Sequence, residues 1–171
     1  IAVENGAVRL TTTPRACSGF DEPYPPETSI DLTAGYAGYE NRKVRWQNVK
    51  GYFIDFAKLY RPQWGPRGYF GDGVEGDDMV AYALTYIHSP KAGRAWLETF
   101  TADGIKIWLN DREVLNRHEH LGQEFSEINH YKVAVDLLQG ENKLLIKVDE
   151  IHYQLQRSQW KLMLKVTDGD G

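Results

Sequence analysis

Residues 102–115 read ADGIKIWLNDREVL, and this stretch decides the fold. Its apolar and polar positions alternate: Ile105, Ile107 and Leu109 with Lys106, Trp108 and Asn110. A period of two is typical of a strand with one buried face. Asn110-Asp111 fits a two-residue hairpin turn, after which residues 112–115 return. The stretch predicts an antiparallel hairpin with Trp108 on the face opposite Ile105.

The same period of two recurs along most of the chain. It predicts strands over residues 44–49, 51–56, 81–86, 95–101, 132–137, 143–148 and 160–167. Residues 89–93 and 139–142 contain glycine, proline or asparagine and are predicted to be turns. No segment keeps a helical period over three turns. The pattern predicts an all-β fold, an antiparallel β-sandwich of the jelly-roll type.

Length and charge exclude several classes of protein. The chain has 171 residues, 42% of them hydrophobic, which suits one domain over residues 1–171 with a core of its own. The net charge of −4 argues against nucleic-acid binding, which relies on a cationic surface. No apolar run reaches the length of a membrane-spanning helix, so we expect no membrane partner. Cys17 is the one cysteine, which excludes an intramolecular disulfide.

Both ends of the chain are predicted to lie outside the sandwich proper. Residues 1–30 are predicted to form an extended lead-in, because four of the seven prolines lie between residues 14 and 30. Residues 167–171 read TDGDG and are predicted to begin a linker. We therefore interpret the chain as part of a longer protein.

Several segments together resemble a known family. They are PETSID (26–31) with VRW (44–46), VAYA (80–83) with IHSP (87–90), the stretch 102–115, residues 133–148, and QWKLML (159–164). These segments resemble the galactose-binding-like β-jelly rolls of bacterial glycan-degrading enzymes, which include many carbohydrate-binding modules. The resemblance implies a galactose-binding-domain-like sandwich, secreted or on the bacterial cell surface, with a polysaccharide and the other domains of a parent enzyme as partners. Residues 149–159 form a longer and more polar loop than the family's short glycine-rich loop, and this could remodel the usual binding edge. We therefore do not assign the ligand of any family member to this chain.

Sugar binding requires an aromatic ring beside hydrogen-bonding groups. The loops 61–78, 116–130 and 149–159 carry such residues, and a site at the loop edge is therefore predicted. The candidate ligand-binding residues are Trp64, Tyr69, His118, His120, His152 and Arg157 at the loop edge, together with Trp108. Trp108 lies on a strand and would serve a site on a sheet face. The alternative is that the loop aromatics plug the end of the sandwich, and Trp46, Trp96 and Trp160 are expected to be core residues.

Two clusters could bind a metal. Asp72, Glu75, Asp77 and Asp78 share a glycine-rich loop, and carboxylates of this kind are ligands for calcium. The spacing does not match an EF-hand, so a calcium site and a solvated acidic loop both stay open. His118 and His120 would share a face if extended and could bind a transition metal with His130 or His152. The alternative is that these histidines are polar loop residues. No other cofactor is expected.

Motifs for catalysis are missing from the sequence. It contains no GxSxG, P-loop or GxGxxG motif, and no catalytic residue is assigned. We predict a non-catalytic carbohydrate-binding module that targets a parent enzyme to a polysaccharide. The alternatives are a structural β-sandwich spacer without a ligand, and a small polysaccharide lyase or hydrolase. A lyase could draw on Tyr131, His130, His152, Tyr153 and Arg157.

Overall fold

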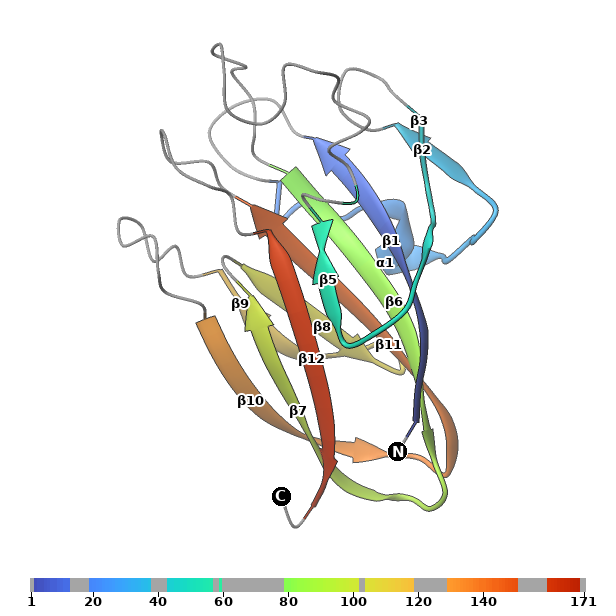
Figure 1. Cartoon of the computed structure of the whole chain (residues 1–171), viewed down its shortest axis with the longest axis vertical. Coiled ribbons are helices and arrows are strands. Elements are labelled where there is room, and N and C mark those ends of the chain that lie inside the picture. The colour runs from blue at the N-terminus through green and yellow to red at the C-terminus, as the bar shows by residue number, and fades with distance from the viewer. Residues whose placement is uncertain are drawn as a thin grey trace.

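The structure, a computed structural model, is an antiparallel β-sandwich (Figure 1). It describes residues 19–37, 43–56, 59, 79–101, 104–118, 129–150 and 160–169, and the backbone of residues 2–12. The predicted all-β class and antiparallel sandwich are confirmed. In the described part of the chain, no helix is long and apolar enough to cross a membrane.

One layer is a six-stranded sheet with the strand order β4-β1-β6-β11-β8-β9. Its strands are β1 (Ala2–Thr12), β4 (Asn48–Val49), β6 (Met79–Ser89), β8 (Ile105–Leu109), β9 (Arg112–Arg117) and β11 (Gly140–Glu150). The second layer is a four-stranded sheet with the order β10-β7-β12-β5. Its strands are β5 (Phe53–Asp55), β7 (Gly93–Thr101), β10 (Asn129–Leu137) and β12 (Lys161–Asp168). The small pair β2 (Gly35–Ala37) and β3 (Lys43–Arg45) and the short helix α1 (Pro25–Thr28) lie beside the six-stranded sheet (Figure 1).

The turns have two different roles. Asn110 and Asp111 have φ angles of 50° and 67°, so β8 and β9 form the predicted hairpin with a left-handed turn that asparagine and aspartate tolerate. Residues 90–92 and 138–139, in contrast, carry the chain from one sheet to the other. The turns predicted at 89–93 and 139–142 are therefore inter-sheet connections, as the β6-to-β7 and β10-to-β11 links show in Figure 1.

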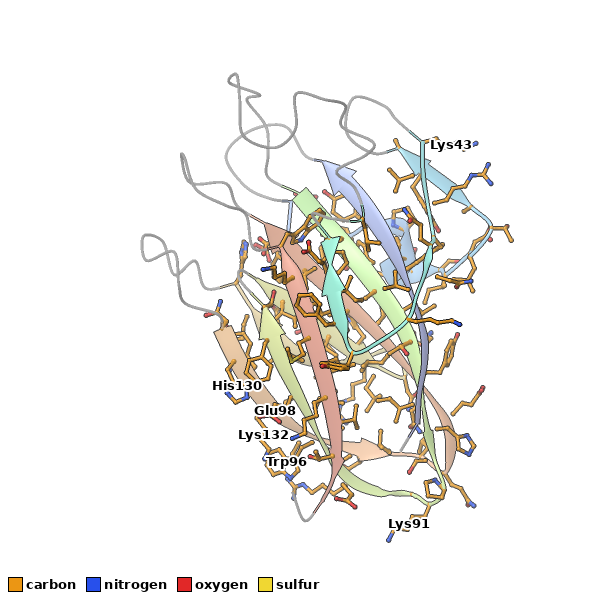
Figure 2. All side chains as sticks on the ribbon, viewed as in Figure 1. Lys43, Lys91, Trp96, Glu98, His130 and Lys132 are labelled. Carbon is orange, nitrogen blue, oxygen red and sulfur yellow. The ribbon has the colours of Figure 1, made fainter. Side chains whose placement is uncertain are left out.

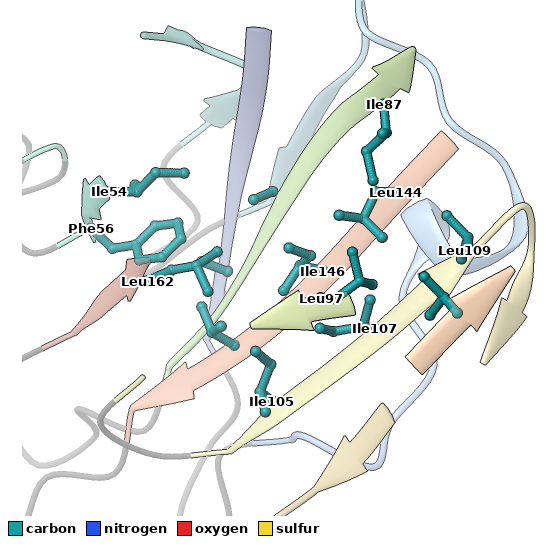
Figure 3. Packing of buried hydrophobic residues seen from close by; sticks show 14 of the residues in the cluster. Ile54, Phe56, Ile87, Leu97, Ile105, Ile107, Leu109, Leu144, Ile146 and Leu162 are labelled. Atoms are coloured by element: carbon teal, nitrogen blue, oxygen red, sulfur yellow. The ribbon is translucent and has the colours of Figure 1, made fainter. Parts of the chain in front are cut away.

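The core lies between the sheets and follows the period of two. In the six-stranded sheet the inward residues of the central strands are Ala81, Ala83, Ile87, Ile105, Ile107, Leu109, Leu144, Ile146 and Val148. The four-stranded sheet contributes Ala95, Leu97, Val135, Leu137 and Leu162. Figure 3 shows these side chains interleaved between the layers. Burial of each large aliphatic side chain contributes about 1.5–3 kcal/mol to folding.

The N-terminal part of the predicted lead-in belongs to the sheet. Residues 2–12 form β1, which pairs with β4 on one side and β6 on the other. The alternation is broken there because β1 holds one more residue than β6 between the pairs Glu4–Tyr86 and Ala7–Leu84. Such a bulge shifts the side-chain parity within the strand, which hides the strand from a period-two search.

Three further boundaries differ from the sequence prediction. Residues 44–49 are divided between β3 and β4, which pair with different strands. The strand predicted at 51–56 is confined to β5. At the C-terminal end Thr167 and Asp168 pair with Trp96 and Ala95 in β7, so the first residues of the predicted linker belong to β12.

The outer face of the six-stranded sheet is closed by residues 19–30. Lys147 in β11 points outward and is fully buried, with its Nζ 2.9 Å from Glu27 Oε1 and 2.7 Å from the Glu22 carbonyl. The ammonium also lies 5.0 Å from the ring centroid of Tyr24 and 5.6 Å from that of Phe20. Burial lowers the pKa of Lys147, and the hydrogen bond to Glu27 opposes that change. A buried ion pair thus fastens α1 to the sheet.

Because this ion pair is buried, removal of one partner leaves the other as a buried charge without a counter-charge. Lys147→Met should lower the free energy of unfolding by about 3–5 kcal/mol, since Glu27 then keeps a charge without its cation. Urea unfolding curves measure the difference. The double variant Lys147→Met/Glu27→Gln should recover part of the loss. Lys165→Met removes a 64% exposed lysine and should cost less than about 1 kcal/mol. A Lys147→Met protein as stable as the wild type would contradict this role.

Candidate functional site

The outer face of the four-stranded sheet is open over the described residues. Alternation along β7 turns Ala95 and Leu97 into the core and sends Trp96 and Glu98 outward. In Figure 1 no described helix or strand lies in front of β10, β7 and β12. The outward side chains of three adjacent strands therefore form one continuous surface, which we call the sheet-face site. Its members are Arg94, Trp96, Glu98, Phe100, His130, Lys132, Ala134, Asp136, Met163, Lys165 and Thr167.

Trp96 occupies the middle of this surface. It is partly exposed, and its cross-strand partners are the small side chains of Ala134 on β10 and Thr167 on β12. Bulky side chains at these two positions would cover the sides of the indole ring. Small ones leave the flanks of the ring accessible, so Trp96 provides apolar surface in the centre of a polar face.

Two cationic side chains lie against this indole. Lys132 Nζ is 5.0 Å from the centroid of the Trp96 ring, and Arg94 Cζ is 5.9 Å from it. Such cation–π contacts contribute about 0.5–1 kcal/mol each at exposed sites. Neither cation forms an ion pair with another described residue, although Asp136 stands opposite Arg94 in the strand register. Figure 2 shows Lys132 and Trp96 side by side on this face.

Glu98 is held in place by two partners. His130 donates from Nε2 to Glu98 Oε1 at 2.8 Å, and Lys165 Nζ lies 3.6 Å from the other carboxylate oxygen. The imidazole of His130 stacks on Phe100 with a centroid distance of 4.3 Å and an interplanar angle of 3°. The hydrogen bond from His130 lowers the pKa of Glu98. The carboxylate therefore stays ionised and fixed in orientation, ready to accept hydrogen bonds.

A second polar cluster ties three strand ends together. Asp149 in β11 is fully buried and accepts hydrogen bonds from the Gly104 amide at 2.5 Å and from His118 Nε2 at 2.9 Å. His118 stacks on Phe20 at 4.2 Å. A Cβ atom on Gly104 would lie 2.6 Å from Asp149 Oδ1. Glycine is therefore needed here for close packing.

The two described residues among the predicted ligand-binding candidates, His118 at the loop edge and Trp108 on a strand, belong to the packing of the six-stranded sheet. His118 is 24% exposed, and its contacts with Asp149 and Phe20 hold it in the fold. Trp108 lies on the face opposite Ile105, as predicted. There it packs against the second apolar cluster, formed by Val80, Tyr82, Leu84 and Leu145. Lys106 Nζ lies 5.1 Å from the ring centroid of Phe20 and 5.9 Å from that of Trp108. Since Phe20 also stacks on His118, Lys106 and Phe20 link Trp108 to His118.

The other predicted site residues lie outside the described residues. These are Trp64, Tyr69, His120, His152 and Arg157, and the acidic residues Asp72, Glu75, Asp77 and Asp78. Their roles stay predictions. Within the described ranges there is no group of three His, Cys, Asp or Glu side chains that could hold a metal ion. His130 is bound to Glu98 on the four-stranded sheet, whereas His118 is bound to Asp149 in the six-stranded sheet.

The centre of the sheet-face site differs from the sequence prediction. Trp96 was expected in the core because it lies on a strand. In the alternation along β7, however, Trp96 lies on the same outward face as Glu98, and Leu97 lies on the opposite, inward face. Trp160 does lie in the main core, whereas Trp46 is partly buried against the second apolar cluster, on the outer face of the six-stranded sheet. The available signal was the alternation in residues 94–100, where every outward position is aromatic or charged. The pairing of β7 with β10 and β12 carries no comparable local signal.

A cavity of about 390 Å³ opens between the sheets beside the connection from β4 to β5. Its described walls include Ala83, Ile146 and Leu162, with the 72% exposed Tyr52 among the lining residues. These walls are mainly aliphatic. A sugar needs several hydrogen-bonding partners, so this cavity suits a sugar less well than the sheet-face site.

Comparison with known proteins gives a likeness of fold. No protein-family model and no curated protein matches the chain. Among solved structures, the chain is similar to a β-glucosidase from Kluyveromyces marxianus in complex with glucose, with a TM-score of 0.58 and 7% identity over 96% of this chain and 16% of the enzyme chain. It is also similar to the PA14 sugar-binding domain of an RTX adhesin, with a TM-score of 0.57 and 12% identity over 99% of this chain and 93% of that one.

A third similar structure is the PA14 domain of the MpAFP antifreeze protein, with a TM-score of 0.53 and 13% identity over the whole of this chain and 86% of that chain. At these identities the likeness shows the β-sandwich fold. It does not single out the galactose-binding-like type that the sequence motifs resemble. The chain spans only 16% of the length of the β-glucosidase chain.

The contact between His118 and Asp149 should make stability depend on pH. The hydrogen bond to Asp149 raises the pKa of His118 above its ordinary 6.5. Because the folded pKa exceeds the unfolded one, this stabilisation is complete below pH 6.5 and is lost as the pH rises through the folded pKa. His118→Gln keeps a hydrogen-bond donor that does not titrate. Urea unfolding from about pH 5.5 to about pH 8.5 should show the wild type losing more stability than His118→Gln. Parallel curves would contradict the assignment.

Proposed function

We propose that this chain is a non-catalytic carbohydrate-binding module that binds a glycan at the sheet-face site. The observation that carries the proposal is the partly exposed indole of Trp96, flanked by Ala134 and Thr167 on an open sheet. Support also comes from the shared fold, because one similar structure is described as a PA14 sugar-binding domain and is matched over 93% of its length. That protein is a sugar-binding domain of nearly the same extent as this chain.

The surface chemistry suits a sugar ring. A pyranose has an apolar C–H face that can pack on an indole, and a rim of hydroxyl groups that need donors and acceptors. The fixed carboxylate of Glu98 accepts hydrogen bonds, while Lys132 and Arg94 donate them. Arg94 and Glu98 flank Trp96 along β7 and Lys132 lies on the neighbouring strand β10, so one sugar residue on the ring can reach several of these groups.

A catalytic role is less well supported by the same groups. A general acid for glycoside hydrolysis needs a raised pKa, whereas the pKa of Glu98 is lowered by His130. His130 and Tyr131, two of the residues considered for a lyase, have neighbouring positions on β10 and therefore point to opposite faces of that sheet. The spacer alternative requires a protein without a glycan ligand, and binding assays decide between it and our proposal.

The wider setting is also part of the proposal. The match to 16% of a β-glucosidase chain supports a module within a larger enzyme, which it would target to a polysaccharide outside the bacterial cell. The galactose-binding-like type remains the narrower family hypothesis. The loop edge with Trp64, Tyr69, His120, His152 and Arg157 would add contacts beyond the sheet. A calcium ion bound by Asp72, Glu75, Asp77 and Asp78 is a further part of this proposal.

If Trp96 anchors the sugar, its truncation should weaken binding. Trp96→Ala should reduce the binding free energy for a bound glycan by about 1.5–3 kcal/mol, the value of a large apolar contact. Isothermal titration calorimetry measures the affinity, and thermal melting checks the fold. Trp108→Ala is the matched control, because that indole lies on the other sheet among covered side chains. A loss of affinity in Trp108→Ala with none in Trp96→Ala would move the site to the six-stranded sheet.

The calcium hypothesis has its own test. If the acidic loop binds calcium, EDTA should lower the melting temperature, because an ion that binds only the folded state stabilises it by mass action. Asp77→Ala should remove the difference between the calcium-loaded and EDTA-treated samples. Asp136→Ala, an exposed carboxylate on β10, should preserve it. Equal melting of the wild type with calcium and with EDTA would leave the solvated acidic loop as the explanation.

A further inference from the structure

We infer that the glycan bound at the sheet-face site is acidic, and that Arg94 and Lys132 recognise its carboxylate or sulfate groups. This inference rests on the proposed function and names the class of glycan. The two cations come from adjacent strands, β7 and β10, and converge on one indole. Trp96 thus holds two positive charges together at the point where a sugar would bind.

The cations next to Trp96 differ from the other charged groups of this surface. Glu98 already has His130 and Lys165 as partners. Arg94 and Lys132 form no ion pair within the described residues, so their contact with the ring leaves their charge available. Asp136 is the acidic side chain opposite Arg94 in the register and lies beyond ion-pair distance. An anionic group bound over Trp96 would meet two donors without displacing an existing salt bridge.

A neutral sugar is less well matched to this arrangement. Stacked on the indole, it offers the cationic heads of Arg94 and Lys132 only uncharged hydroxyl groups as acceptors. An acidic sugar can use the same cations as charged hydrogen-bond donors, which are stronger than neutral ones. The chain as a whole carries a net charge of −4. Two cations on one aromatic ring, without an ion-pair partner among the described residues, are therefore a local feature and not a consequence of composition.

The test compares polymers that differ only in charge. Polygalacturonate is paired with its methyl ester to test carboxylates, and dextran sulfate is paired with dextran to test sulfates. In at least one pair the acidic polymer should bind about tenfold or more tightly than its neutral partner, the effect of a charge-assisted hydrogen bond. The preference should shrink as salt screens the charges. A preference within the polygalacturonate pair identifies the acidic group as a carboxylate, and a preference within the dextran pair identifies it as a sulfate.

Matched variants locate the effect. Arg94→Gln/Lys132→Gln should abolish most of the acidic preference while binding to a neutral glycan is retained. Lys43→Gln/Lys91→Gln makes the same change in net charge at two exposed lysines away from Trp96, and should keep the preference (Figure 2). Melting curves confirm that both double variants are folded.

Three outcomes would overturn the inference. One is an acidic preference that survives in Arg94→Gln/Lys132→Gln. Another is equal affinity for the acidic and the neutral polymer of both pairs, together with weaker binding by Trp96→Ala. That result would refute the acidic preference and still support a glycan site at Trp96. The last is a lack of binding to all four polymers, after which titration of neutral glycans against Trp96→Ala decides the general proposal by itself.

Discussion

The alternation of side chains along β7 is the constraint on which both the core and the proposed site depend. Ala95 and Leu97 fill the interior, so Trp96 and Glu98 must face outward. A shift of the strand by one residue would bury Glu98 and expose Leu97. Because β7 is paired on both sides, with β10 and β12, its register is fixed twice. The hydrophobic core therefore sets the geometry of the sheet-face site.

The outer faces of the two sheets differ: residues 19–30 cover that of the six-stranded sheet, whereas that of the four-stranded sheet is open over the described residues. On the six-stranded sheet Lys147 and Tyr82 point outward, and residues 19–30 cover them with a buried ion pair and aromatic rings. On the four-stranded sheet the outward indole of Trp96 is flanked by two cationic side chains and by small neighbours. The covered face is stabilised by these contacts, whereas the four-stranded sheet presents a central ring on a face that is open over the described residues. This difference is why we propose the glycan site on the four-stranded sheet.

Much of the fold could be predicted from the sequence, because a period of two is a local property. The stretch 102–115 predicts β8, the turn and β9, and the structure confirms them with positive φ angles at Asn110 and Asp111. Strand β1 could not be found this way, since its bulge interrupts the period. The change of sheet at residues 138–139 also leaves no local trace, because turn residues look alike in hairpins and in inter-sheet connections.

The candidate site was harder to predict than the fold. Glu98, His130 and Lys165 are far apart in the sequence and meet only because β10 and β12 both pair with β7. The aromatic residues chosen from composition lie in loops outside the described residues, apart from Trp108. Gly104 illustrates the same limit, since the close approach of Asp149 that requires a glycine comes from a strand 45 positions away.

The most direct test of the account is an NMR titration that follows the indole N–H signals of the tryptophans with a bound glycan. We predict that the signal of Trp96 moves most and that the amides of β7, β10 and β12 move with it, while the signal of Trp108 stays in place. A glycan that shifts Trp108 and the amides of residues 19–30, and leaves Trp96 unchanged, would contradict the assignment of the sheet-face site.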